Sequence, residues 1–237
     1  MDLIEVFQDT EKFSNQMLES VSTKHDFDSI WTFIPEQTND NVKVLNMDSV
    51  SAAVMFSKFG KTCVLNMASP TTVGGGVKEG ARAQEECLFR CSNLTHVISQ
   101  EMYPLKMDEC IYTKDVKFFK DFHYNYIDEI VVDVITIAAP NIGGQKAYQG
   151  FNYEVDMKEK ISLMLSLPIE NGVKNIILGA WGCGVFGNDP KEVSELFRNV
   201  LTTRGYQNQF DNVVFAIIND HNSVGSNYEV FKETFEA

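Results

Sequence analysis

Apolar runs typical of buried strands alternate with helical patterns along most of this chain. Short β-branched runs indicate strands buried on both faces, and apolar positions three or four residues apart indicate helices that pack on a sheet. Strands are predicted over residues 42–46, 62–67, 110–113, 115–119, 130–138, 174–180 and 211–218. Helices are predicted over residues 9–24, 50–59, 81–98, 152–172, 190–204 and 227–235. This alternation predicts an α/β fold in which helices cover both faces of a mixed or mostly parallel sheet.

The first 41 residues do not follow this alternation. Residues 9–24 predict a surface helix, and residues 26–41 are irregular, with Trp31, Phe33 and Pro35 among polar residues. We therefore expect residues 1–41 to form an N-terminal helical extension packed on the core. Residues 42–237 contain no repeat, low-complexity tract or linker, so one domain is predicted there.

Three glycine-bearing loops follow predicted strands, at residues 68–80, 139–150 and 181–189. In open α/β sheets, ligands bind outside the carboxyl ends of the strands. The three loops are therefore expected to gather at one end of the sheet and to form the functional site there.

The first of these loops carries the strongest chemical signal, in the stretch SPTTVGGGVKEGARAQEE at residues 69–86. Three successive glycines, from Gly74 to Gly76, allow backbone N–H groups to approach an anion or a sugar. Glu85 and Glu86 can hold a proton at neutral pH, because two neighbouring carboxylates resist ionising together. A flexible turn before a polar helix start would explain the same residues, but the position directly after a buried strand favours a site.

The loop at residues 181–189 contains GCGVFG, from Gly182 to Gly187, which formally matches a dinucleotide-binding fingerprint. It follows a late strand, Pro190 begins the next helix only after two further residues, and no acidic residue ends a strand about 20 residues on. A nicotinamide-dependent oxidoreductase is therefore disfavoured, and a loop whose N–H groups wrap a diphosphate is expected. Asp48 has two open interpretations, a helix N-cap and an acceptor for an adenine amino group.

The net charge of −13 disfavours nucleic-acid binding, which needs clustered Lys and Arg. An anionic ligand would have to be held by backbone N–H groups and helix N-termini. The five cysteines are dispersed and form no CxxC, which favours a reducing, cytoplasmic compartment over a disulfide framework. No apolar run approaches the roughly 18 residues of a membrane span, and the N-terminus lacks a secretory signal pattern.

With these residues placed, the sequence resembles a macrodomain of the poly(ADP-ribose) glycohydrolase type, closest to its microbial branch. The similar segments are VLNMDSVSAA, VLNMASPTTVGGGVKEGARAQEECLFRCSNL, IYTKDVKFFKD, VDVITIAAPN, ILGAWGCGVFGNDPKEVSELF and VVFAIIND, in order between residues 44 and 220. The resemblance implies a three-layer α/β/α fold that binds ADP-ribose. It also implies cleavage of the O-glycosidic bond at ribose C1″, with no metal and no cofactor.

The resemblance also assigns the site residues. It implies that Glu86 is the catalytic acid and that Glu85 binds ribose hydroxyls and raises the proton affinity of Glu86; the residues alone do not choose between the two. Phe186 would pack on the distal ribose. The substrate-binding residues implied are Asp48, Asn66, Ser69, Gly74, Gly75, Gly76, Gln84, Asn141, Gly182, Gly184, Val185, Phe186 and Gly187.

One position departs from the family pattern. Larger glycohydrolases of this group carry an Asn just before the glycine loop, where this chain has Ser69, with Asn66 three residues upstream. Which of the two contacts the ribose stays open.

A hydrolase that removes ADP-ribose from a polymer or from a modified protein, and that acts as a monomer, is therefore expected. The alternative is a reader that binds ADP-ribose without turnover. A reader needs the glycine loops but not the two glutamates, so the presence of Glu85 and Glu86 favours the enzyme.

Overall fold

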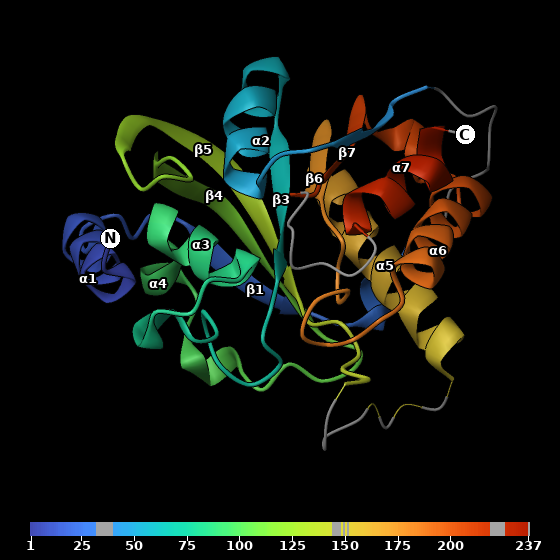
Figure 1. Cartoon of the computed structure of the whole chain (residues 1–237), viewed down its shortest axis with the longest axis horizontal. Helices are drawn as coiled ribbons and strands as arrows, with labels where there is room; N and C mark the ends of the chain where they lie inside the picture. Colours follow the sequence, from blue (N-terminus) through green and yellow to red (C-terminus); the bar gives the residue numbers. More distant parts are fainter. Residues whose placement is uncertain (32–39, 144–147, 149, 151, 219–225, 237) are drawn as a thin grey trace.

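Seven strands form one mixed sheet in the part of the chain that the computed structural model describes, which is residues 1–31, 40–143, 148, 150, 152–218 and 226–236. Their order across the sheet is β1-β4-β5-β3-β6-β7-β2 (Figure 1). Strands β5, β3, β6, β7 and β2 are parallel, and β4 and β1 extend the β5 edge in antiparallel fashion. The bounds are β1 Val21–His25, β2 Val42–Leu45, β3 Thr62–Met67, β4 Cys110–Lys120, β5 Tyr126–Ile137, β6 Asn175–Leu178 and β7 Asn212–Ala216.

Helices cover both faces of the sheet, as the alternating pattern predicted. The sheet separates α1 to α4 from α5 to α7 (Figure 1). Side chains along a strand point alternately to opposite faces, so Val64 of β3 joins the core under the first helices, whereas Cys63 and Leu65 join the core under the last three. The three-layer α/β/α prediction is confirmed. The helices are α1 Leu3–Ser14, α2 Ser49–Phe56, α3 Gln84–Cys91, α4 Leu94–Val97, α5 Tyr153–Glu170, α6 Pro190–Thr203 and α7 Asn227–Glu236.

The N-terminal region differs from the prediction of one helix over residues 9–24. Helix α1 begins at Leu3, because the Asp2 side chain accepts hydrogen bonds from the backbone N–H groups of Ile4 and Glu5. It ends at Ser14, and residues 21–25 form β1, which pairs with β4 in the register Val21 to Lys114. Part of the N-terminal segment therefore builds the same sheet as the rest of the chain. A domain boundary near residue 41 stays a prediction.

The predicted helix over residues 81–98 is divided into α3 and α4. At the break, Ser92 forms an isolated antiparallel bridge with Phe118, and the Asn93 backbone N–H donates to the carbonyl of Lys117. The chain leaves helical geometry at Ser92 because β4 supplies these partners. The pattern of apolar positions continued through the break and gave no sign of it.

The two short strands predicted over residues 110–119 are one strand, β4, with a register shift between Thr113 and Val116. Asp115 has a positive φ of 57° at this bulge, and its N–H donates to the buried Asp133 carboxylate. Strand β5 begins at Tyr126, earlier than predicted, because its exposed first half pairs with β4 in a hairpin. Residues 32–39, 144–147, 149 and 219–220, which carried predictions, lie outside the described residues.

A buried lysine fixes α1 to the sheet. Lys120 of β4 is only 1% exposed, and its Nζ donates to Asp9 Oδ2 at 2.7 Å and to Thr10 Oγ1 at 2.9 Å. The Tyr126 hydroxyl also donates to Asp9 Oδ2, and the two donors lower the pKa of Asp9. Thr10 in turn donates to the carbonyl of Arg90, which ties α1 to α3.

We predict that Asp9→Ala lowers the free energy of unfolding by about 1–3 kcal/mol, because it leaves the buried Lys120 ammonium without its charged partner. Urea denaturation followed by circular dichroism measures the change. Glu195→Ala is the matched control: its pair with Lys191 is half exposed, so the expected change is within about 0.5 kcal/mol. Equal effects of the two substitutions would contradict this account of α1.

Candidate functional site

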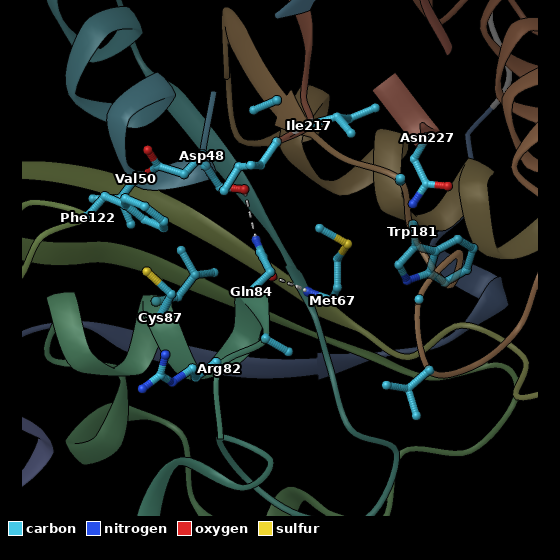
Figure 2. Close-up of a pocket in the computed structure, with 18 of the residues that line it drawn as sticks. Asp48, Val50, Met67, Arg82, Gln84, Cys87, Phe122, Trp181, Ile217 and Asn227 are labelled. Atoms are coloured by element: carbon cyan, nitrogen blue, oxygen red, sulfur yellow. Dashed lines mark hydrogen bonds between the residues drawn. The ribbon is translucent and has the colours of Figure 1, made fainter. Parts of the chain in front are cut away.

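A cavity of about 830 Å³ lies at the carboxyl ends of the parallel strands. It is lined by residues at or just after the ends of four of them: Met67 at the end of β3, Ala139 after β5, Trp181 after β6 and Ile217 after β7. Gln84, at the start of α3, lies in the same wall (Figure 2). For the described residues of the three glycine-bearing loops, the prediction that they gather at one end of the sheet is confirmed.

The glutamate pair, Glu85 and Glu86, lies in the first turn of α3 and is almost removed from water, with exposed fractions of 3% and 7%. Glu85 Oε1 accepts from Asn66 Nδ2 at 3.3 Å, and Glu85 Oε2 accepts from the backbone N–H of Ser69 at 2.7 Å. Glu86 Oε1 accepts from the N–H of Gly76 at 2.9 Å. Glu86 Oε2 is buried and has no hydrogen-bond partner among the described residues. One oxygen of the pair is therefore left without a hydrogen bond, and neither glutamate is among the residues that line the cavity, although Gln84 and Cys87 on the same helix are.

Burial raises the pKa of Glu85 to about 8, and the neighbouring charge of Glu86 acts in the same direction. The backbone N–H groups of Ser69 and Gly74 and the Asn66 amide favour the ionised form but do not offset the burial. Glu85 therefore holds a proton at neutral pH. The expectation concerned the proton affinity of Glu86; the group whose pKa is raised here is Glu85.

The glycine triplet lies directly against these carboxylates. A Cβ on Gly75 would be 2.6 Å from Glu86 Oε1 and 3.0 Å from Glu85 Oε2, and the φ of +55° also disfavours any other residue. A Cβ on Gly74 would be 2.8 Å from the Phe89 ring, and one on Gly76 would be 2.9 Å from Ala81 Cβ. Glycine is thus required by the close packing of loop and glutamates. Contact of Gly75 and Gly76 with a ribose or phosphate stays a prediction.

Gln84 joins α3 to the end of β3. Its Nε2 donates to the Leu65 carbonyl at 2.6 Å and to Ser49 Oγ at 3.2 Å, and its Oε1 accepts from the Met67 N–H at 3.0 Å. These bonds lie in the cavity wall, between Asp48 and Met67 (Figure 2). The Gln84 side chain therefore fixes the position of the helix start, and its contact with a ligand stays a prediction.

Asp48 is the N-cap of α2, one of its two predicted roles. Its Oδ1 accepts from the Ser51 N–H at 2.8 Å and its Oδ2 from Ser51 Oγ at 2.6 Å. Asp48 also lines the cavity, so capping leaves it within reach of a ligand. A contact with adenine stays a prediction.

The loops after β5 and β6 form one unit. The N–H groups of Ile142 and Gly143 donate to the Phe186 carbonyl at 2.9 and 3.0 Å. Asn188 Nδ2 donates to the carbonyls of Pro140 and Gly182, both at 2.9 Å. Of the predicted diphosphate loop, the residues that line the cavity are Gly182, Gly184, Val185 and Phe186.

Two other predicted residues serve the loops themselves. Gly187 has a φ of +74° near the end of the loop after β6 and does not line the cavity. Asn141 also lies outside the cavity wall, and its Oδ1 accepts from the Gly143 N–H at 3.1 Å. The start of α6 argues against a dinucleotide fingerprint, because Asp189 Oδ1 already accepts from the N–H groups of Lys191 and Glu192.

Asn66 and Ser69, the two candidates for contact with the ribose, both donate hydrogen bonds to Glu85. Asn66 is fully buried, and besides Glu85 its Nδ2 contacts Thr136 Oγ1 at 3.3 Å. The Ser69 hydroxyl accepts from the N–H groups of Thr71 and Thr72 and so shapes the glycine loop. Neither side chain lines the cavity. Asn66 therefore supports Glu85 through its side-chain amide, and Ser69 supports it through its backbone N–H.

Sequence analysis missed part of the cavity wall. The hairpin between β4 and β5 contributes residues 122–124, and Arg82, Cys87 and Asn227 also line the space. Phe122, Arg82 and Cys87 form one end of it, and Trp181 and Asn227 the other (Figure 2). The aromatic residues at the hairpin tip were the one sign of this part of the wall in the sequence, and they belong to no recognised motif.

The described residues bring together no group of three or more His, Cys, Asp or Glu side chains that could hold a metal ion. Across the same residues, no helix is long and apolar enough to cross a membrane. All five cysteines are free thiols.

Comparisons with known proteins agree with this geometry. Residues 6–121 match the family model described as the catalytic domain of microbial-type PARG, and no curated protein sequence matches the chain. Poly(ADP-ribose) glycohydrolase from Thermomonospora curvata is 22% identical, with 98% of each chain covered and a TM-score of 0.84.

Structures from Deinococcus radiodurans are also similar. The glycohydrolase solved in complex with ADP-ribose is 24% identical, covering 97% of this chain and 96% of that one, with a TM-score of 0.75. A single-residue variant of it, also in complex with ADP-ribose, is 26% identical, covering 98% and 92% of the chains, with a TM-score of 0.74. The matched residues 6–121 include the glycine loop and the glutamate pair, and the fold extends over the rest of the described chain. Residues 6–121 are therefore similar to the catalytic domain of microbial-type PARG, and the described chain has the macrodomain-like fold of these bacterial glycohydrolases.

Proposed function

We propose that this protein is an ADP-ribosyl glycohydrolase, which hydrolyses the O-glycosidic bond at ribose C1″ of poly(ADP-ribose) or of protein-linked ADP-ribose. The observation that carries the proposal is the buried glutamate pair with one free carboxyl oxygen, held beside the cavity of a family fold. The glycohydrolase from Deinococcus radiodurans that was solved with ADP-ribose bound has a similar fold.

The free oxygen supports Glu86 as the reacting group. Both oxygens of Glu85 accept hydrogen bonds from Asn66 and Ser69, whereas Glu86 uses only Oε1, toward Gly76. Neighbouring residues on a helix point about 100° apart, so only one of the two can face the reacting carbon. Glu85 is the supporting member, because it is fixed from two sides and holds a proton at neutral pH.

The chemistry follows from one proton held by two carboxyl groups. Cleavage passes through an oxocarbenium-like transition state; the proton that Glu85 holds in the resting protein passes to Glu86, and Glu86 gives it to the leaving oxygen as the C1″–O bond breaks. Water then attacks C1″ and returns its proton to the Glu86 carboxylate, which completes the hydrolysis. General acid help of this kind contributes about 10²–10⁴-fold.

The substrate class fits the charge of the chain. ADP-ribose carries a diphosphate, while the protein has a net charge of −13, so the ligand must be held by local donors. The glycine-rich loop that lines the cavity around Gly184 offers backbone N–H groups for this purpose. We further propose that the protein acts as a monomer. A reducing compartment is also proposed, and the five free thiols support it.

Glu86→Gln is predicted to lower the rate of ADP-ribose release by about 10²–10⁴-fold, because an amide cannot donate the catalytic proton. Purified protein is incubated with poly(ADP-ribose) and with O-linked ADP-ribosylated protein, and released ADP-ribose is quantified by liquid chromatography. Glu101→Gln, a change of an exposed glutamate outside the pair, is expected to keep full activity.

The outcomes of this assay separate the candidate functions. If wild type and Glu86→Gln release equally little ADP-ribose but both bind it in calorimetry, the protein is a reader and the proposed activity is wrong. Full activity of Glu86→Gln would show that the catalytic residue is misassigned while the function holds.

Gly75→Ala is predicted to reduce both stability and activity. The added methyl group would lie 2.6 Å from Glu86 Oε1 in a left-handed backbone conformation, so the loop or the carboxylate must move. We expect the free energy of unfolding to fall by about 1–3 kcal/mol and kcat to fall at least about tenfold. Gly184→Ala is the control for stability, since nothing lies within 4 Å of its Cβ position. Equal stability of the two variants would contradict the close packing described above.

The raised pKa of Glu85 predicts a specific pH dependence of stability. The folded-state pKa is about 8 against a model value of 4.5, so between these pH values the folded protein holds a proton that the unfolded chain has lost. The contribution of Glu85 is therefore fully present below about pH 4.5 and is lost as pH rises toward 8. Glu85→Gln removes this term, so its stability relative to wild type should rise by about 1–3 kcal/mol from pH 5 to pH 9. Urea denaturation at each pH measures the difference; a difference that stays constant with pH would refute the raised pKa.

A further inference from the structure

The wall of the cavity contains one arginine, Arg82, that the proposed reaction does not use. Among the described residues that line the cavity, Arg82 is the only Lys or Arg and Asp48 is the only Asp or Glu. In the view of Figure 2 both lie toward the same end of the cavity, and Phe122 and Cys87 lie between them. Trp181, where the glycine-rich loop proposed for the diphosphate begins, lies at the opposite end. The diphosphate therefore does not explain the only cation of the wall.

The backbone on both sides of Arg82 is held in place. Before it, the Ala81 N–H donates to the Gly76 carbonyl at 3.0 Å. After it, the Ala83 carbonyl accepts from the Cys87 N–H at 3.1 Å, at the start of α3. The Arg82 side chain is exposed, and no hydrogen bond or ion pair joins its guanidinium to another described residue. A set of N–H donors is thus attached to a fixed point of the wall and is free to meet a ligand.

The hairpin tip between β4 and β5 gives this end of the cavity a rigid aromatic side. The Asp121 carboxylate accepts from the N–H groups of His123 at 2.8 Å and Asn125 at 2.9 Å. Tyr124 has a φ of 65°, a backbone conformation that is uncommon for residues other than glycine. The rings of Phe122 and His123 meet edge to face, with their centroids 5.6 Å apart. Since these three aromatic residues line the cavity, a flat ring has a fixed surface to pack against.

The polar groups at this end define what a flat ligand must offer. A carboxylate only accepts hydrogen bonds, and Asp48 keeps lone pairs after its oxygens bond to Ser51. A guanidinium only donates. The ligand therefore needs a donor toward Asp48 and an acceptor toward Arg82. Adenine has both, an exocyclic amino group and ring nitrogens, whereas guanine has an oxygen acceptor where adenine has its amino group.

We propose that Arg82 is a specificity-determining residue, which donates a hydrogen bond to a ring nitrogen of the adenine of ADP-ribose while Asp48 accepts from the amino group. The inference rests on the proposed function for the identity of the ligand, and on the composition of this end of the cavity for the place of the base. Together the two residues recognise the base by a donor and an acceptor. A base that lacks either partner is rejected, because a polar group of the wall then loses water without gaining a hydrogen bond.

Arg82→Met tests the proposal, because methionine keeps an unbranched apolar stem and removes every guanidinium donor. We expect the Kd of ADP-ribose, measured by calorimetry on the full chain, to rise about tenfold. In the release assay KM should rise with little change in kcat, because the contact with the base is the same in the ground state and the transition state.

Lys78→Met is the matched control. Lys78 is also exposed and lies only four residues before Arg82, but it does not line the cavity. The same charge is removed, so a general effect of charge on an anionic ligand would appear in both variants. We expect the Kd of ADP-ribose to stay within about twofold, because salt screens an exposed charge that makes no direct contact.

Ligand analogues locate the contact on the base. ADP-ribose is compared with analogues in which carbon replaces one ring nitrogen of the adenine, at N1, N3 or N7. Wild type should bind one of these analogues about tenfold more weakly than ADP-ribose, whereas Arg82→Met should bind that analogue and ADP-ribose equally. A role of Arg82 in the fold alone would not couple one side chain to one ring nitrogen.

Several results would overturn the inference. One is an unchanged Kd of ADP-ribose in Arg82→Met, and another is a loss of affinity that is equal for ADP-ribose and every analogue; if such a loss also disappears at high salt, Arg82 holds a phosphate instead of the base. Failure of wild type to bind ADP-ribose would overturn it as well. If wild type shows the coupling but releases no ADP-ribose from any substrate, the proposed function fails and the role of Arg82 stands.

Discussion

Two adjacent carboxyl groups buried at the start of one helix are the constraint around which this structure is arranged. Removing a carboxylate from water is expensive unless donors replace the solvent or the group keeps its proton. Among the described ion pairs, none involves Glu85 or Glu86. Backbone N–H groups of Ser69 and Gly76, the Asn66 amide and a retained proton take the place of a cation. The pair is therefore stable without a fixed positive charge, and its protonation state can change.

The use of backbone N–H donors in place of a cation explains why this loop is rich in glycine. N–H donors reach the carboxylates only if the loop backbone lies closer than a side chain would allow, as the 2.6 Å approach at Gly75 shows. The loop needs anchors of its own, and it has them in the Ser69 hydroxyl and the Gln100 amide. Gln84 fixes the other side by joining the helix start to the end of β3. Positioning of the pair is thus spread over segments on both sides of it.

Most of the sheet could be predicted because buried parallel strands are marked by continuous β-branched runs, as in residues 130–138. The errors occurred where a partner distant in the chain determines local structure. Val21 lies in a strand because Lys114 pairs with it, and the helix after the glutamates breaks at Ser92 because Phe118 offers a bridge there. Neither partner can be recognised from the spacing of apolar residues nearby.

The sequence by itself determined the α/β class, the alternation of strands and helices after residue 41, the glycine triplet and the two glutamates that follow it. These follow from local patterns, because periodicity, loop glycines and the first turn of a helix are properties of short stretches of chain. Only the tertiary structure decided that Glu86 has an unpaired oxygen and that Asn66 and Ser69 both support Glu85. Burial and hydrogen bonding are set by groups that meet in space, and for these residues the groups come from separate segments of the chain.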